Sequence, residues 1–201
     1  MPRTFALLPA AGKSRRMGRP KLLLPLGEST VLDHVISAVR NGGVTDILVV
    51  TGPDGAELAE RAIKAGALVL KLADDTPDMR ATCLHGLAEL EARFHPSAED
   101  GWLLLPADHP TVHADVVRTL IDTAQTVANK TIIVPTHRGR RGHPTWLRWS
   151  HGADIRARPA GEGLNALIRA RQAETLELDW PSDEVVRDLD TPEDYEALSR
   201  A

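Results

Sequence analysis

The chain has 201 residues, of which 42% are hydrophobic, and its formal net charge is −4. This length suits a single domain over residues 1–201 with one buried core. Nucleic-acid binders are usually basic and carry interleaved aromatic residues, so a negative net charge with 3% aromatic residues argues against one and favours small anionic ligands.

Strand and helix patterns alternate along the chain. Short, mostly apolar runs that end in Gly, Pro or Asp predict buried strands at residues 5–10, 46–52, 67–73, 102–108 and 131–135. Helical periodicity lies between and after them, at residues 30–43, 54–66, 80–94 and 113–130. This alternation predicts an α/β fold with a Rossmann-like, doubly wound and mostly parallel sheet covered by helices on both faces, in three layers.

Ligands of such sheets bind beyond the carboxyl ends of the strands. The first predicted strand ends in small residues that let backbone N–H groups approach a ligand: Ala10, Ala11 and Gly12. A set of cations follows within residues 2–27, which hold no acid: Lys13, Arg15, Arg16, Arg19 and Lys21. The spacing matches neither the dinucleotide fingerprint nor the Walker motif. We therefore expect a triphosphate here; for Lys13 and Arg19 the alternative is a solvated basic loop.

Two carboxylates are candidate metal ligands. Asp108 follows a buried strand, where a carboxylate is costly unless it is paired or binds a metal. Asp190 stands directly before Thr191 and Pro192 in the acid-rich C-terminal part. Either residue can instead cap the helix that follows it, and for Asp190 this alternative is strong.

A second cationic segment follows the fifth predicted strand. Residues 123–153 hold no acid, and their glycine-punctuated tip carries Arg138, Arg140, Arg141 and His143. We expect this tip to face a phosphate on the second substrate, with Gly139 and Gly142 giving the backbone freedom to wrap it. Trp146 and Trp149 either stack on a flat ring or anchor the loop to the core, and Cys83 is expected in the core.

Residues 10–26, AAGKSRRMGRPKLLLPL, follow the pattern Ala-Ala-Gly-x-Ser-x-Arg-Met-Gly-x-x-Lys-x-Leu-Leu-Pro-Leu. The chain thereby resembles the MobA-like nucleotidyltransferases, and within them the molybdenum cofactor cytidylyltransferases. Three further segments are similar to that family in the same order: PADHP at 106–110, RGHP at 141–144 and DLDTPEDY at 188–195. The resemblance implies a fold of the nucleotide-diphospho-sugar transferase type.

The resemblance also implies a role for each matched residue. Ala10, Ala11 and Gly12 would lie against the nucleotide, Arg16 and Lys21 would hold its phosphates, and Thr82 would read the base. Asp108 and Asp190 would bind Mg²⁺, so that the catalytic set is Lys21, Arg16 and Asp108. The acceptor-side loop would be Arg141, Gly142 and His143. Departures from the family pattern at Asp78, Arg80, His109 and Glu162 leave the base and the acceptor open.

The expected reaction is Mg²⁺-dependent transfer of CMP from CTP to an acceptor phosphate, with molybdopterin as the implied acceptor. CTP is favoured because family members with Ala-Ala-Gly in this loop tend to use it. The alternatives are GTP or another nucleoside triphosphate, or a sugar or polyol phosphate as acceptor; a nucleotide-binding regulator without activity is disfavoured because the cations and carboxylates are all present. The resemblance further implies transient contact with a molybdoenzyme or chaperone.

A cytoplasmic location is also expected. No run of eighteen apolar residues is present, and the apolar N-terminal stretch is too short for a secretory signal. The single cysteine excludes an intrachain disulfide and a zinc cluster, and fits a reducing compartment. We expect no membrane and no nucleic-acid partner.

Overall fold

A mixed, mostly parallel sheet forms the centre of the computed structural model, which describes residues 2–14, 16–159 and 161–200. Arg15, one of the expected phosphate-side cations, lies outside the described residues. Strands along the sheet follow the order β10-β7-β9-β6-β1-β4-β5, and β8 pairs with β7. Their bounds are β1 Thr4–Ala10, β4 Ile47–Thr51, β5 Leu68–Lys71, β6 Gly101–Leu104, β7 Ile132–His137, β8 Arg140–Arg141, β9 Thr145–Arg148 and β10 Thr175–Asp179.

The pairing confirms the predicted, mostly parallel sheet and adds two antiparallel strands, β9 and the short β8, which pairs with β7. β6, β1, β4 and β5 run parallel, as do β7 and β10. β9 lies between β6 and β7 and is antiparallel to both. A separate two-stranded sheet joins β2 Pro25–Leu26 to β3 Ser29–Thr30.

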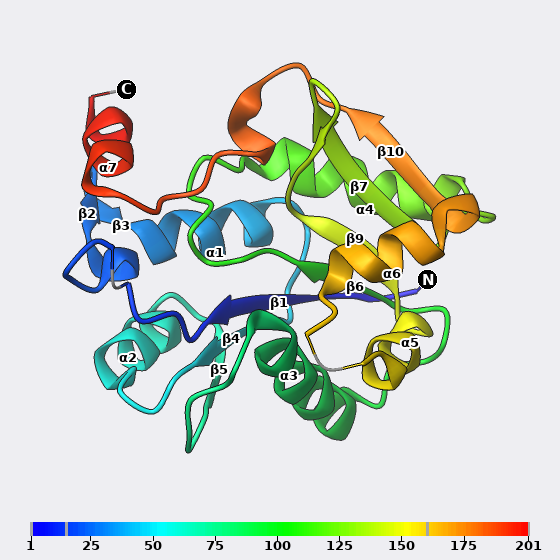
Figure 1. Cartoon of the computed structure of the whole chain (residues 1–201), viewed down its shortest axis with the longest axis horizontal. Coiled ribbons are helices and arrows are strands. Elements are labelled where there is room, and N and C mark those ends of the chain that lie inside the picture. Colours follow the sequence, from blue (N-terminus) through cyan, green and yellow to red (C-terminus); the bar gives the residue numbers. More distant parts are fainter. Residues whose placement is uncertain (1, 15, 160, 201) are drawn as a thin grey trace.

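Helices cover both faces of the sheet. Their bounds are α1 Val31–Asn41, α2 Ala56–Lys64, α3 Met79–Phe94, α4 Ala114–Thr126, α5 His151–Ala157, α6 Leu164–Ala170 and α7 Pro192–Ser199, with short 3₁₀ turns η1 Lys21–Leu23, η2 Gln172–Glu174 and η3 Asp183–Val185. In Figure 1, α1 and α4 lie above β1, and α3 and α5 lie below it. Among the described residues, no helix combines the length and apolar character that a membrane crossing requires.

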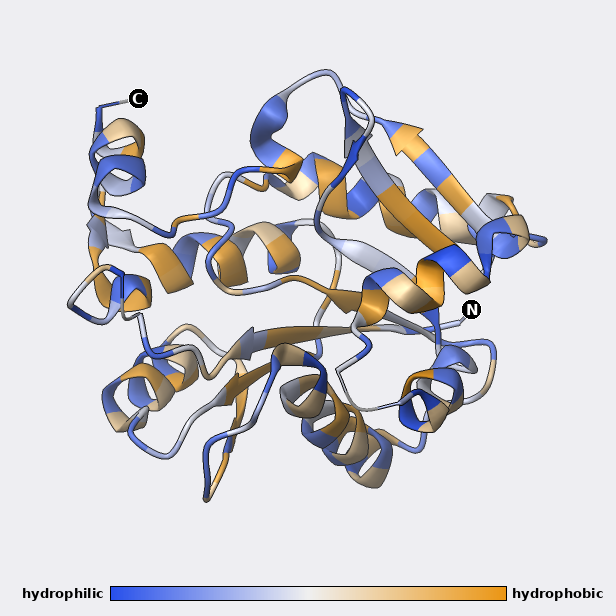
Figure 2. Ribbon diagram, in the orientation of Figure 1, coloured by the Kyte–Doolittle hydropathy of each residue, from blue (hydrophilic) through white to orange (hydrophobic). Residues whose placement is uncertain are grey.

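The core is divided by the sheet because successive strand residues point to opposite faces. Along β1, Ala6 and Leu8 join the cluster formed with α1, α2 and α4, whereas Phe5 and Leu7 join the cluster formed with α3, α5 and α6. Figure 2 shows the hydrophobic residues concentrated on the strands and on the helix faces turned toward them. The three-layer arrangement follows from this two-sided burial.

Helix starts are set by capping residues that the sequence supplies. Thr30 and Asp33 form a capping box at α1, and the Asp33 carboxylate also accepts bonds of 2.8 and 3.0 Å from Arg61 of α2. Asp78 caps α3 by accepting a bond of 2.8 Å from the Ala81 N–H. Asp78, which departs from the family pattern, thus has a structural role.

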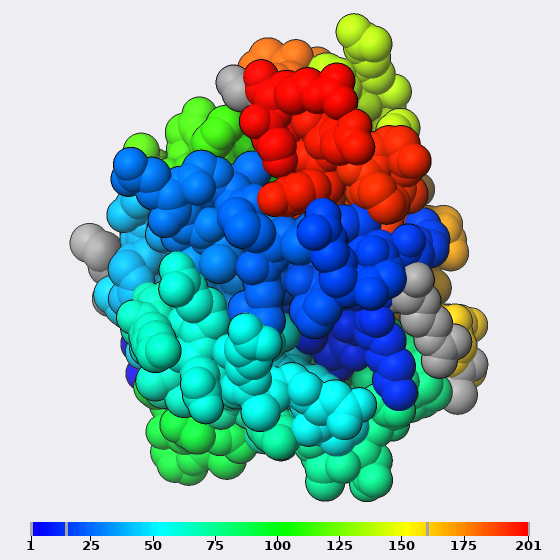
Figure 3. Space-filling view, turned by 90° about the vertical axis from the view of Figure 1, so that its left-hand side faces the viewer, coloured from blue at the N-terminus to red at the C-terminus, as the bar shows by residue number. Residues whose placement is uncertain are grey.

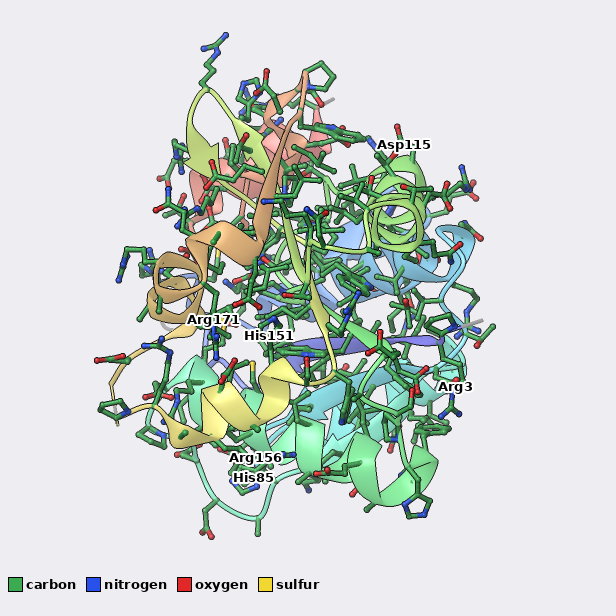
Figure 4. The ribbon with its side chains drawn as sticks, turned by 90° about the vertical axis from the view of Figure 1, so that its right-hand side faces the viewer. Arg3, His85, Asp115, His151, Arg156 and Arg171 are labelled. Atoms are coloured by element: carbon green, nitrogen blue, oxygen red, sulfur yellow. The ribbon has the colours of Figure 1, made fainter. Side chains whose placement is uncertain are left out.

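A polar network fastens α5 to the amino end of β7. His151 lies 2.9 Å from an Asp154 oxygen and 2.7 Å from the Thr131 hydroxyl, and Arg171 donates to Asp154 over 3.0 Å. Figure 4 shows His151 and Arg171 side by side on this face. The cluster lies at the end of the sheet opposite the carboxyl ends of the parallel strands, so it holds the fold and is remote from the expected site.

Candidate active site

A tight turn shapes the loop after β1. Met17 and Gly18 donate their N–H groups to the Ser14 carbonyl over 3.0 and 3.1 Å, with Ser14 and Gly18 at positive φ. The Met17 side chain is buried in the core and anchors the loop. The Ser14 hydroxyl also accepts a bond of 3.2 Å from the Lys21 N–H. The turn therefore holds Lys21 at the carboxyl end of β1.

Backbone pairing brings the two expected metal ligands to the same place. The chain after β6 continues alongside β1, because Leu105 N–H donates to Leu7 and Ala107 N–H donates to Pro9. Asp108 follows at once, beyond the end of β1. Its carbonyl accepts a bond of 2.8 Å from the Leu189 N–H, which sets the adjacent Asp190 beside it.

Four charged side chains meet at this point. Lys21 Nζ lies 2.7 Å from Asp108 Oδ2 and 2.8 Å from Asp190 Oδ1, and Arg16 Nη2 lies 2.6 Å from Asp190 Oδ2. Burial alone would lower the pKa of Lys21, but the two carboxylates outweigh it and raise that pKa. Burial alone would raise the pKa of Asp190, but Lys21 and Arg16 outweigh it and lower that pKa. Both shifts favour the charged forms of Lys21 and Asp190.

Helix capping does not occupy either carboxylate. Thr191 caps α7 in a capping box with Asp194, and His113 stands at the N-cap of α4. The capping alternative for Asp108 and Asp190 is therefore wrong.

The cluster fits a divalent cation held partly by substrate. Within residues 2–14, 16–159 and 161–200, no group of three or more His, Cys, Asp or Glu side chains is arranged to hold a metal ion. Asp108 and Asp190 nonetheless converge on one positive group, the Lys21 ammonium. Mg²⁺ prefers this limited donor set, because it usually takes one or two carboxylates and completes its shell with phosphate oxygens and water.

Three hollows surround the first loop, and we name each after one lining residue. The Asp190 hollow, about 340 Å³, is lined by the charged cluster together with Pro9 and Ala10. The Thr82 hollow, about 430 Å³, lies between the loop and the start of α3. The Asp54 hollow, about 490 Å³, lies between the loop, η1 and the β4–α2 connection. Gly12 and Lys13 line all three, and Figure 3 shows this face, with the dark-blue N-terminal segment between the red C-terminal segment and the cyan α2 region.

The first-loop residues expected to touch the nucleotide all line these hollows: Ala10, Ala11 and Gly12. Thr82 lines its own hollow, where its hydroxyl lies 2.6 Å from that of Thr76. Two uncharged hydroxyls can each donate or accept a hydrogen bond, which suits the edge of a base. Sequence reasoning missed Asp75, which lines two hollows; its position after the parallel strand β5 is the signal that points to it.

The acceptor-side loop lies outside the three hollows. Two expectations about it need correction: that Gly142 gives the backbone freedom, and that His143 adds to the positive charge of the basic tip. Arg141 is paired with Glu177 of β10, with Nε 2.7 Å from the carboxylate. Gly142 packs on Val185, whose carbonyl oxygen would lie 2.2 Å from an added Cβ, so packing rather than freedom to wrap a phosphate requires this glycine. Burial lowers the pKa of His143 to about 3, so that its ring adds no positive charge.

His143 is nevertheless close to the cluster through His109. The two imidazole rings meet edge to face with centroids 4.8 Å apart, and His109 Nε2 lies 3.9 Å from Asp108 Oδ1. Among the described residues, both Nδ1 atoms are buried without a hydrogen-bond partner. Contact of His143 with an acceptor remains a prediction.

The remaining open residues have structural positions. Arg80 donates to the carbonyls of Ile155 and Arg158 over 2.9 and 2.7 Å, and so ties α3 to the end of α5. Glu162 pairs with Arg158 over 2.7 Å. Trp146, Trp149 and Cys83 are all buried in the core. The two tryptophan rings therefore anchor their segment to the core and do not stack on a ligand. Burial raises the pKa of the Cys83 thiol to about 12.

Comparison with known proteins places this geometry among nucleotidyltransferases. The family model described as MobA-like NTP transferase domain matches residues 6–176. Molybdenum cofactor cytidylyltransferase of Escherichia coli strain K12 is 26% identical over 94% of this chain and 92% of its own. Probable molybdenum cofactor guanylyltransferase of Bacillus mycoides is 26% identical over 70% and 66%. The crystal structure of Rv0371c from Mycobacterium tuberculosis H37Rv, in complex with manganese, superposes with a TM-score of 0.79 at 24% identity over 100% and 99%.

Proposed function

The chain belongs to the MobA-like NTP transferase family, and from this premise we propose that it transfers CMP from CTP to the phosphate of molybdopterin with release of pyrophosphate. Residues 1–201 act as one nucleotidyltransferase domain in this proposal, and the cytoplasmic location expected from the sequence is part of it. The observation that carries the proposal is the cluster at the end of β1, in which Lys21 and Arg16 meet Asp108 and Asp190.

The reaction requires these residues to position the two substrates and to neutralise the charge on the phosphates. An acceptor phosphate oxygen attacks the α-phosphorus of the nucleotide, and the bond from that phosphorus to the pyrophosphate oxygen breaks. Lys21 and Arg16 bind the phosphates and offset the charge that develops on the non-bridging and leaving oxygens. The small side chains of the first loop leave its backbone N–H groups free to approach the same phosphates.

Asp108 and Asp190 would hold the divalent cation. When bound, Mg²⁺ supplies charge neutralisation on the phosphates. Each carboxylate now contacts Lys21, so the ammonium must leave the carboxylates when it turns to a phosphate. The manganese complex of Rv0371c, a structural relative, supports a divalent cation in this fold.

Packing at Ala11 supports CTP as the nucleotide. A Cβ added at Gly52 would lie 3.6 Å from the Ala11 carbonyl oxygen and 3.9 Å from the Ala11 Cβ, so this methyl group lies close to the β4–α2 connection. A glycine at position 11 would open that space. We therefore expect Ala11→Gly to shift the preference from CTP toward GTP, and an unchanged preference in direct binding measurements would contradict this reason for favouring CTP.

Guanylyl transfer is the second candidate, because the probable guanylyltransferase of Bacillus mycoides shows the same 26% identity, over 70% of this chain against 94% for the cytidylyltransferase. A thermal-shift screen of CTP, GTP, ATP and UTP with Mg²⁺ separates the two, since a ligand that binds the folded state raises the melting temperature. CTP should give the largest rise. A larger rise with GTP would make guanylyl transfer the better proposal, and no rise with any nucleotide would contradict both.

A further inference from the structure

Lys13 and Asp75 form an ion pair across the nucleotide side of the site. Lys13 belongs to the first loop and Asp75 to the connection from β5 to α3. The Asp54 hollow and the Thr82 hollow share four lining residues, namely Ala11, Gly12, Lys13 and Asp75. The ion pair thus lies on the boundary between these two hollows and links the first loop to the β5–α3 connection.

The hollows on either side of this pair differ in the groups that they offer a base. The Thr82 hollow presents the hydroxyls of Thr76 and Thr82. Its three carboxylates already have partners: Asp75 pairs with Lys13, Asp78 accepts from the Ala81 N–H, and Asp108 pairs with Lys21. The Asp54 hollow is larger and presents the carboxylates of Asp54 and Glu57, with Arg19 also in its lining. Hydroxyls both donate and accept, as the mixed edge of cytosine requires, whereas ionised carboxylates only accept, which suits the adjacent N–H donors of guanine.

We propose that the Lys13–Asp75 pair selects the base, by keeping it in the Thr82 hollow and closing the Asp54 hollow to it. This inference rests on the proposed function, in which the first loop binds a nucleoside triphosphate. Specificity is a difference between two affinities, and a barrier against one base is as effective as a contact with the other. Lys13 and Asp75 are therefore specificity-determining residues.

The strength of this selection is limited by solvent. The Lys13 and Asp75 side chains are 46% and 50% exposed, and an exposed ion pair is weak. Opening it should therefore change the ratio of the two nucleotide affinities by about threefold to fivefold, the upper part of the range that such a pair supports.

Another role for Lys13 would give a different pattern. If its ammonium instead turned to the phosphates, Lys13→Ala would weaken every nucleotide equally, because phosphates are common to all of them. Asp75→Ala would then free Lys13 and strengthen every nucleotide equally. Base selection predicts that both variants move the ratio in the same direction.

The experiment is isothermal titration of the full chain with CTP and with GTP, each with Mg²⁺ and without acceptor. In Lys13→Ala and in Asp75→Ala, the ratio of the GTP Kd to the CTP Kd should fall about threefold to fivefold relative to wild type. The exchange of both charges, Lys13→Asp with Asp75→Lys, should restore the ratio. Arg93→Ala, which breaks an exposed pair with Glu89 on α3, is the matched control and should leave it unchanged.

An unchanged ratio in either single variant, with CTP still bound, would overturn the inference and leave the proposed function standing. Failure of the charge exchange to restore the ratio in a folded protein would also overturn it. Absence of nucleotide binding by the wild type would instead contradict the proposed function itself.

Discussion

Replacing Lys21 by methionine should destabilise the metal-free protein and make its stability depend on Mg²⁺. The ammonium contacts Asp108 and Asp190 at 2.7 and 2.8 Å, and its side chain is only 12% exposed. Methionine keeps the packing of the aliphatic stem but leaves both carboxylates without this partner. Loss of a partner from a buried polar group costs about 1–3 kcal/mol. Since the carboxylates are about a quarter exposed, we expect about 2 kcal/mol in total, or a fall in Tm of about 4–8 °C at this chain length.

Millimolar Mg²⁺ should reverse much of this loss. In the variant the cation binds the two freed carboxylates directly, whereas in the wild type it competes with Lys21 for them. Differential scanning fluorimetry with and without Mg²⁺ measures both effects, and Lys130→Met, which removes an ammonium bound to the Ala173 carbonyl, is the control. An equal Mg²⁺ response in variant and wild type, or a variant as stable as the wild type without metal, would refute the reasoning.

Three further predictions address the cluster and its neighbours. Asp108→Asn and Asp190→Asn should each keep the fold and lower CMP transfer at least about a hundredfold, measured as pyrophosphate release, and near-normal turnover would contradict the metal assignment. His143 is buried and neutral in the folded state with a pKa of about 3, while an unfolded histidine takes up a proton near pH 6.5. Stability that depends on this ring is present above pH 6.5 and is lost as the pH falls toward 3. Between pH 7 and pH 5, the free energy of unfolding measured in urea should therefore fall about 2 kcal/mol less for His143→Asn than for the wild type. Equal decreases would contradict a buried, neutral His143. Arg80→Ala should lower the free energy of unfolding by about 1–3 kcal/mol without altering the CTP-to-GTP ratio in titrations, and an altered ratio would show that it reads the base.

The elements with strong periodicity could be predicted from the sequence, and those formed by tertiary contacts could not. Each of the five predicted strands and four predicted helices overlaps an element of the structure. β9, Thr145–Arg148, was missed because four residues carry no readable period, and only its place between β6 and β7 makes it a strand. α5 and α6 have seven residues each, too few for a clear amphipathic pattern.

In the candidate site, too, some features could be predicted from the sequence, whereas others depend on tertiary contacts. The rule on strand ends and the family resemblance both pointed to Lys21 and Asp108, and the structure places them in contact. Which carboxylate meets which cation depends on the backbone bond from Leu189 to Asp108, which no sequence pattern reports. The sequence does not show that burial keeps the His143 ring neutral, so that this residue adds no charge to the basic tip.

Pyrophosphate release by the purified protein tests the central claim most directly. With CTP, Mg²⁺ and molybdopterin present, release should occur and should yield the CMP-linked acceptor in equal amount, because each transfer breaks one bond to pyrophosphate. Omission of molybdopterin, or replacement of CTP by GTP, should reduce it to a small fraction. Release that is as fast with GTP, or that does not require the acceptor, would contradict the proposal that this chain is a cytidylyltransferase acting on molybdopterin.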